Sequence, residues 1–147
     1  MERTLGLIKP DAIAAGHTGK ILDHILQAGF RIVGLKMLHL SRVQAETFYA
    51  VHRERPFFES LVQFMTSGPV IAFVLEKPDA VAAYRDLMGA TDPSKAAPNT
   101  LRSLYGQNIE RNAVHGSDSL ENARREISFF FSEAELLALE TPAFSAV

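Results

Sequence analysis

Short apolar segments alternate with segments of helical periodicity along most of the chain, and this alternation limits the possible folds more than any other feature. Residues 4–8, 30–40 and 70–76 are predicted strands, because they are rich in aliphatic residues and lie next to proline, glycine or serine. A fourth, brief strand is expected at Ala113 and Val114, directly before His115. The chain therefore has enough strands for a small sheet.

Helices are expected between these strands, where apolar residues recur at a spacing of three or four. Ser41 and Asp118 are expected to cap two of them, since serine and aspartate side chains accept hydrogen bonds from the first free backbone N–H groups. The expected helical segments are residues 18–29, 43–52, 57–65, 79–88, 101–105 and 118–131, followed by a last turn or two within residues 132–139.

The order of these segments is compatible with two kinds of α and β architecture. One is a doubly wound parallel sheet, and the other is a ferredoxin-like antiparallel sheet covered by helices. Periodicity does not decide between them. No repeat, low-complexity tract or long linker divides the chain, so residues 1–147 are expected to form a single domain.

Composition narrows the classes of function. The net charge of −2 provides no general attraction to nucleic acid, so we expect no main role in binding it. The absence of cysteine excludes disulfides and thiolate chemistry. No secretory leader is visible, and the strongly apolar run at residues 69–75 is shorter than the ~20 residues that span a bilayer. A cytoplasmic protein without membrane contact is expected.

His115 stands out among the five histidines because of its neighbours. Gly116 leaves space beside the imidazole for a bulky phosphate, and Ser117 and Asp118 can provide polar contacts at a helix start. Glu126 follows about two helical turns later and could reach back to orient the ring. From these residues alone, a phosphate-accepting histidine and a histidine that merely packs in a capped turn both remain open.

The common phosphate-binding and metal-binding motifs are absent. The sequence contains no Walker A motif, no GxGxxG and no HExxH, so isolated cations would have to hold any phosphate. Lys9, which precedes Pro10 at the end of the first predicted strand, is one candidate, and Arg85 and Arg102 are two others. Taken singly, each could equally be an ordinary surface cation. Phe57 could stack on a base or pack in the core.

Several motifs, in this order, resemble the nucleoside diphosphate kinase family, over roughly residues 3–136. The last segment is highly specific for that family. The matching segments are Ile8-Lys9-Pro10-Asp11, Gly29-Phe30-Arg31-Ile32-Val33-Gly34, Phe48-Tyr49 with His52, Arg55-Pro56-Phe57-Phe58, Ser67-Gly68-Pro69-Val70, Leu87-Met88-Gly89-Ala90-Thr91-Asp92-Pro93, Thr100-Leu101-Arg102 and Asn112-Ala113-Val114-His115-Gly116-Ser117-Asp118-Ser119. One departure is Asn99, which stands where many members carry glycine.

The resemblance implies an α+β fold with a ferredoxin-like, four-stranded antiparallel sheet covered by helices, a βαββαβ core with extra helices. It also implies residue roles. His115 would become phosphohistidine, supported by Ser117 and Glu126, and Lys9 would act with it in catalysis. The positions implied to contact nucleotide are Lys9, Tyr49, His52, Phe57, Leu61, Arg85, Thr91, Arg102, Ile109, Asn112 and Gly116.

The implied activity is a ping-pong transfer of the terminal phosphate, mainly from ATP, to a nucleoside diphosphate. Mg²⁺ is expected as a cofactor that arrives with the nucleotide phosphates, near Asp118. The resemblance also implies a homo-oligomer, either a tetramer or a hexamer built from dimers. A catalytically silent nucleotide-binding scaffold of the same fold is the alternative. A helical histidine phosphorelay module is a weaker one, because strands are predicted here.

Overall fold

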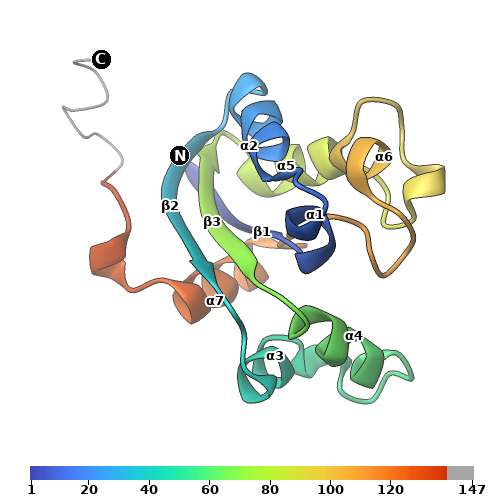
Figure 1. The fold of residues 1–147 in the computed structure, drawn as a ribbon. Helices are drawn as coiled ribbons and strands as arrows, with labels where there is room; N and C mark the ends of the chain where they lie inside the picture. Colours follow the sequence, from blue (N-terminus) through green and yellow to red (C-terminus); the bar gives the residue numbers. More distant parts are fainter. Residues whose placement is uncertain (139–147) are drawn as a thin grey trace.

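The computed structural model describes residues 1–138 of the chain, and its centre is a four-stranded antiparallel sheet (Figure 1). The strands are β1 (Glu2–Ile8), β2 (Arg31–Leu38), β3 (Val70–Lys77) and β4 (Val114–Gly116), in the spatial order β2-β3-β1-β4. Each neighbouring pair is antiparallel. This pairing excludes the doubly wound parallel sheet and confirms the ferredoxin-like alternative.

Helices connect the strands in the expected βαββαβ order, because α2 lies between β1 and β2 in the chain and α5 lies between β3 and β4. The α-helices are α1 (Pro10–Ala14), α2 (Thr18–Gln27), α3 (Arg42–Phe48), α4 (Phe58–Met65), α5 (Ala80–Met88), α6 (Leu101–Tyr105) and α7 (Leu120–Phe130). Short 3-10 helices are η1 (Ala50–His52), η2 (Pro93–Lys95) and η3 (Glu133–Glu135). No helix within residues 1–138 has the length and apolarity needed to cross a membrane.

Alternating side chains of the strands form two hydrophobic cores, one on each face of the sheet. On β1, Leu5 and Leu7 belong to the core shared with α3, α4 and α7, whereas Ile8 belongs to the core shared with α2 and α5. All three side chains are fully buried. Burying both faces in this way fixes the register of β1, since a slip of one residue would exchange the two sets of side chains.

Four details differ from the sequence-based expectations. Pro10 begins helix α1 instead of only ending the strand, because proline is well suited to the first helical position. The expected helix 43–52 is divided into α3 and η1. Ser119, and not Asp118, caps α7, since its side chain accepts from the backbone N–H of Asn122. The expected last helical turn is η3 alone, and Leu139 lies outside the described residues.

Candidate active site

The ends of β1 and β4 bring Lys9 and His115 to the same part of the sheet. His115 lies opposite Leu7 in the β1–β4 pairing, and the backbone N–H of Lys9 donates to the Ala113 carbonyl at 2.8 Å. Ala113 has a φ of +75°, which is unfavourable for a residue with a Cβ atom. The buried Asp11 carboxylate holds this conformation by accepting from the Ala113 N–H at 3.1 Å. A contact between residues far apart in the sequence thus fixes the start of the strand that carries His115.

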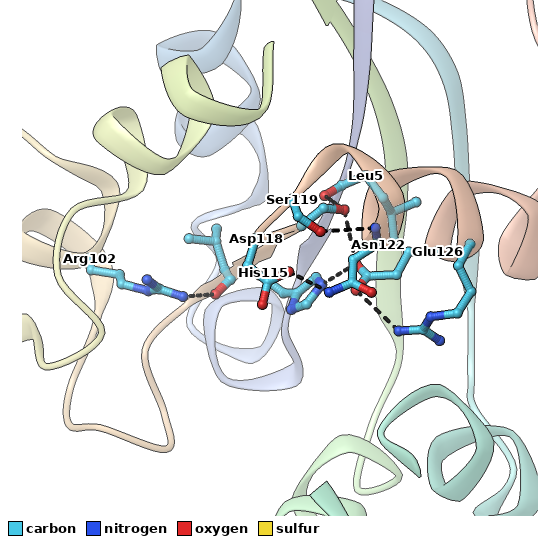
Figure 2. Close-up of polar contacts among 10 residues, drawn as sticks. Leu5, Arg102, His115, Asp118, Ser119, Asn122 and Glu126 are labelled. Carbon is cyan, nitrogen blue, oxygen red and sulfur yellow. Dashed lines mark hydrogen bonds and ion pairs between the residues drawn. The ribbon is translucent and has the colours of Figure 1, made fainter. Parts of the chain in front are cut away.

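The His115 ring is oriented by a carboxylate on α7 (Figure 2). Glu126 Oε1 lies 2.8 Å from His115 Nε2 and also accepts from Ser117 Oγ at 3.0 Å. Because a carboxylate only accepts hydrogen bonds, Nε2 carries the proton and the lone pair is on Nδ1. Within residues 1–138, Nδ1 has no hydrogen-bond partner. The ring therefore offers Nδ1 as a nucleophile.

Aromatic side chains at the end of α3 pack against the same imidazole. The Phe48 ring meets His115 edge-on at 5.3 Å between centroids, and Tyr49 does so at 6.2 Å. Burial raises the pKa of the Tyr49 hydroxyl, so this group stays neutral at physiological pH. The His115 side chain keeps 20% exposure despite these contacts. The ring is thus held in place and still open to a ligand.

Lys9 places a cation at the bottom of the site. Its side chain is buried, and Nζ donates to Asn112 Oδ1 at 2.8 Å. The Asn112 amide is itself fixed, because its Nδ2 donates to the carbonyls of Thr91 at 3.0 Å and Ile109 at 3.1 Å. Burial, followed by the nearby Arg102 charge, lowers the pKa of Lys9 to about 8. The negative charges of Asp11 and Glu110 act in the opposite direction but do not cancel the effect of burial.

Two arginines add positive charge on the other side of the pocket. Arg102 on α6 donates to the Gly89 carbonyl at 3.1 Å and to the Val114 carbonyl at 3.0 Å, and burial lowers its pKa. Figure 2 shows it approaching His115 from the side opposite Glu126. Arg85 on α5 is exposed at the pocket edge. These contacts give Arg102 a structural role in addition to its charge.

A pocket of about 420 Å³ collects these side chains. It contains every predicted catalytic or nucleotide-contacting residue except Ser117, which is buried behind Glu126. The pocket-lining residues that were predicted from the sequence are Lys9, Tyr49, His52, Phe57, Leu61, Arg85, Thr91, Arg102, Ile109, Asn112, His115, Gly116, Asp118 and Glu126. A larger, more open depression of about 650 Å³ lies beside the start of β1 and α7, but it has no imidazole among its lining residues. We therefore place the chemistry in the smaller pocket.

An apolar cleft of about 310 Å³ adjoins the cationic pocket and shares Lys9 with it. Phe57, Leu61 and Ile109 provide its apolar surface. Phe57 is 45% exposed, whereas Phe58 packs against the core, so the two neighbouring aromatic residues face different environments. The arrangement of an apolar cleft beside a cationic pocket suits a molecule with a flat ring and an anionic tail.

Several residues of the site were not identified from the sequence. Phe48, Asn122 and Arg125 also line the pocket, and Arg125 lies 3.5 Å from Glu126 Oε2. Arg125 directly precedes the predicted site residue Glu126, and this neighbouring position could have identified it as a candidate. Asp11 was recognised only as part of a motif, because its contact with Ala113 spans 102 positions.

Asp118 is the carboxylate best placed to approach a metal ion bound to phosphate. It is exposed at the pocket edge, and the hydrogen bond from Asn122 at 2.6 Å lowers its pKa. Among the residues that the structure describes, no group of three histidine, cysteine or acidic side chains could form a metal cage. The donor set therefore fits a hydrated cation that is held mainly by its ligand's phosphates.

Comparison with known proteins gives one consistent family. A sequence model described as nucleoside diphosphate kinase matches residues 2–136. A nucleoside diphosphate kinase of Wolinella succinogenes is 60% identical over 136 residues, covering 92% of this chain and 99% of the relative. One from Nitratiruptor sp. is 57% identical over 137 residues, covering 93% of this chain and all of the relative.

Solved structures agree with the sequence relatives. The crystal structure of the Aquifex aeolicus nucleoside diphosphate kinase aligns with a TM-score of 0.91 at 50% identity, covering 92% of this chain and 99% of the other. A nucleoside diphosphate kinase from Halobacterium salinarum, solved in complex with CDP, also has a TM-score of 0.91, at 41% identity, with 99% of this chain and 97% of the other covered.

Proposed function

The chain belongs to the nucleoside diphosphate kinase family, and on this basis we propose that His115 carries the phosphoryl group between a nucleoside triphosphate and a nucleoside diphosphate. The overall reaction of the chain is the transfer of a terminal phosphate from a triphosphate to a diphosphate. One observation carries the assignment of His115: Glu126 holds Nε2, while Nδ1 has no hydrogen-bond partner within residues 1–138 and the same pocket is lined by cationic side chains that include Lys9, Arg85 and Arg102. A silent scaffold would not need this arrangement.

Each half-reaction is an in-line displacement at phosphorus. In the first, the Nδ1 lone pair forms a bond to the terminal phosphorus, and the bond from that phosphorus to the bridging oxygen breaks. The oxygen leaves with the bonding electrons as part of the diphosphate. In the second, a terminal oxygen of another diphosphate attacks the phosphohistidine, and the electrons of the N–P bond return to Nδ1. The Nε2 proton stays beside Glu126 throughout.

Positioning and charge neutralisation provide most of the catalysis, since the transition state of phosphoryl transfer is loose. Lys9 and Arg102 approach the phosphate region from buried or half-buried positions, and Arg85 adds an exposed guanidinium. The Glu126 carboxylate stabilises the positive charge that develops on the imidazole when Nδ1 is phosphorylated. Asp118, an exposed carboxylate that lines the pocket, would be available to contact the hydration shell of Mg²⁺, and the cation would neutralise further phosphate charge when bound with the nucleotide.

The base and sugar are proposed to occupy the apolar cleft. Phe57 is exposed there and can stack on a base from any nucleotide, because every base has an aromatic face. ATP and other nucleoside tri- and diphosphates are thus the proposed ligands. The complex of the Halobacterium salinarum relative with CDP supports a nucleotide in this fold.

We also propose a cytoplasmic homo-oligomer built from dimers, with the chain as a single domain. Exposed apolar side chains support self-association: Leu35 is 52% exposed and Met37 is 61% exposed on β2, the strand at one edge of the sheet. Such residues on an edge strand favour contact with another chain. Light scattering of the purified protein would distinguish a tetramer from a hexamer.

The proposed nucleophile is tested by brief incubation with γ-labelled ATP. The label should attach to His115, resist base, be released by acid and pass to an added diphosphate. His115→Ala should bind nucleotide but acquire no label, and His24→Ala, which alters a histidine on α2, should label normally. Labelling and turnover in His115→Ala, after contaminating kinase is excluded, would refute the assignment.

A further inference from the structure

A hydrogen bond that the proposed reaction does not use joins the helix and the loop on either side of the apolar cleft. Ser60 on α4 donates from Oγ to Glu110 Oε2 at 2.7 Å, although the two residues are 50 positions apart. Glu110 lines the cleft together with Phe57 and Ile109. The carboxylate is thus tied to the opposite wall at the place where a base would stack.

The loop that carries Glu110 is fixed by further contacts. Asn108 Oδ1 accepts from the backbone N–H groups of Glu110 at 3.0 Å and Arg111 at 2.8 Å. The Arg111 guanidinium lies 5.1 Å from the centre of the Phe64 ring on α4, which gives a second contact between the loop and this helix. The carboxylate position therefore exists before a ligand binds, so little ordering is needed on binding.

Glu110 is the one acidic side chain among the described residues that line this cleft. Its Oε2 accepts from Ser60, and Oε1 has no hydrogen-bond partner within residues 1–138. The other charged side chain of the cleft, Lys9, donates from Nζ to Asn112 Oδ1 at 2.8 Å and to the backbone carbonyl of Glu110 at 3.5 Å, so these two bonds leave the Glu110 carboxylate oxygens uncovered. A carboxylate only accepts hydrogen bonds, so it selects for N–H donors and against carbonyl oxygens on a ligand.

The bases differ in what they offer to such an acceptor. Guanine presents a ring N–H next to an amino group, and this pair matches a carboxylate. Uracil presents one ring N–H between two carbonyl oxygens, which a carboxylate repels. We propose, on the basis of the proposed function, that Glu110 is a specificity-determining residue that favours guanine nucleotides over uracil nucleotides in the cleft. Stacking on Phe57 supplies the affinity common to all bases.

The test compares acceptor diphosphates on enzyme that ATP has first phosphorylated. In the natural protein, kcat/KM for GDP should exceed that for IDP, which lacks only the 2-amino group, by about tenfold, a typical effect of one charge-assisted hydrogen bond. Glu110→Gln should bring the GDP to UDP ratio close to one, because an amide both donates and accepts. Ser60→Ala keeps the carboxylate, so its GDP to UDP ratio should stay above that of Glu110→Gln.

Three results would overturn the proposal. The first is equal kcat/KM for GDP and IDP in the natural protein, a comparison that needs no variant to fold. The second is an unchanged GDP to UDP ratio in Glu110→Gln. The third is a fall in kcat/KM of Glu110→Gln that occurs with GDP but not with 2′-deoxy-GDP. That result would show that the carboxylate contacts the sugar hydroxyl and not the base. Failure of the proposed function is visible separately, as the absence of phosphorylated His115 before any acceptor is added.

Discussion

The low pKa of Lys9 predicts that phosphate binding weakens as the solution becomes alkaline. Burial lowers this pKa from an ordinary 10.5 to about 8. The change corresponds to roughly 3 kcal/mol of unfavourable interaction for the charged ammonium in the free site. Phosphate oxygens next to Nζ would offset this cost and raise the pKa in the complex. Binding should therefore take up a proton above pH 8.

The sign of the effect on stability follows from the same pKa. Because the pKa is depressed in the folded protein, the stability that neutral Lys9 confers is present above pH 10.5 and is lost as the pH falls through about 8. At neutral pH the charged Lys9 side chain thus destabilises the folded state of the free protein. Lys9→Met should lose activity without losing stability to urea, although it also gives up the hydrogen bond to Asn112.

The assay is kcat/KM for ATP between pH 6.5 and 9.5, because ATP reacts with the unphosphorylated enzyme and this ratio reports ionisations of that free form. The value should fall above about pH 8, approaching tenfold per pH unit, since neutral Lys9 cannot pair with phosphate. Lys9→Arg should have a lower kcat/KM than the natural protein at neutral pH, but its kcat/KM should not change with pH, because a guanidinium stays charged in this range. A natural protein with a flat profile to pH 9.5, or an equal fall in Lys9→Arg, would refute the reasoning.

Three further substitutions test other parts of the site. Glu126→Gln removes the charge beside the ring and should slow phosphorylation about tenfold in rapid-quench experiments; an unchanged rate would contradict the role of the carboxylate. Gly116→Ala would place a Cβ atom 2.6 Å from a methionine on α5 and should cost about 1–3 kcal/mol in urea unfolding, whereas Gly19→Ala, in open space on α2, should stabilise by about 0.5–1 kcal/mol. Asp11→Ala leaves the Ala113 N–H unpaired, so it should lower the free energy of unfolding by about 1–3 kcal/mol and also reduce activity. An unfolding free energy equal to that of the natural protein would show that this contact is dispensable.

The strands and main helices were predictable because each depends on local periodicity. The segment that became β3 reads as one apolar run, and the structure buries it on both sides. The cap of α7 was not predictable with certainty, since Asp118 and Ser119 are both good capping residues and only the backbone conformation decides. Helix α1 was missed because Pro10 indicates both the end of a strand and the start of a helix.

Most residues that share the pocket were named from the sequence, but their geometry was not. Local physics left the role of His115 open, and the resemblance to a family favoured a phosphate-accepting histidine. The positive φ of Ala113 could not be read from the sequence, because alanine rarely adopts it and a distant Asp11 maintains it. Asn99, by contrast, has a φ of +68°, and its place at a usual glycine position was a signal for that conformation. Contacts between distant segments were what sequence reasoning lacked.

The most direct measurement is the identity of the phosphorylated nitrogen on His115, obtained by ¹⁵N and ³¹P NMR of the enzyme trapped after reaction with ATP. Because Glu126 occupies Nε2, phosphorus should be bonded to Nδ1 and Nε2 should retain its proton. Phosphorus on Nε2, or on any residue other than His115, would contradict the account.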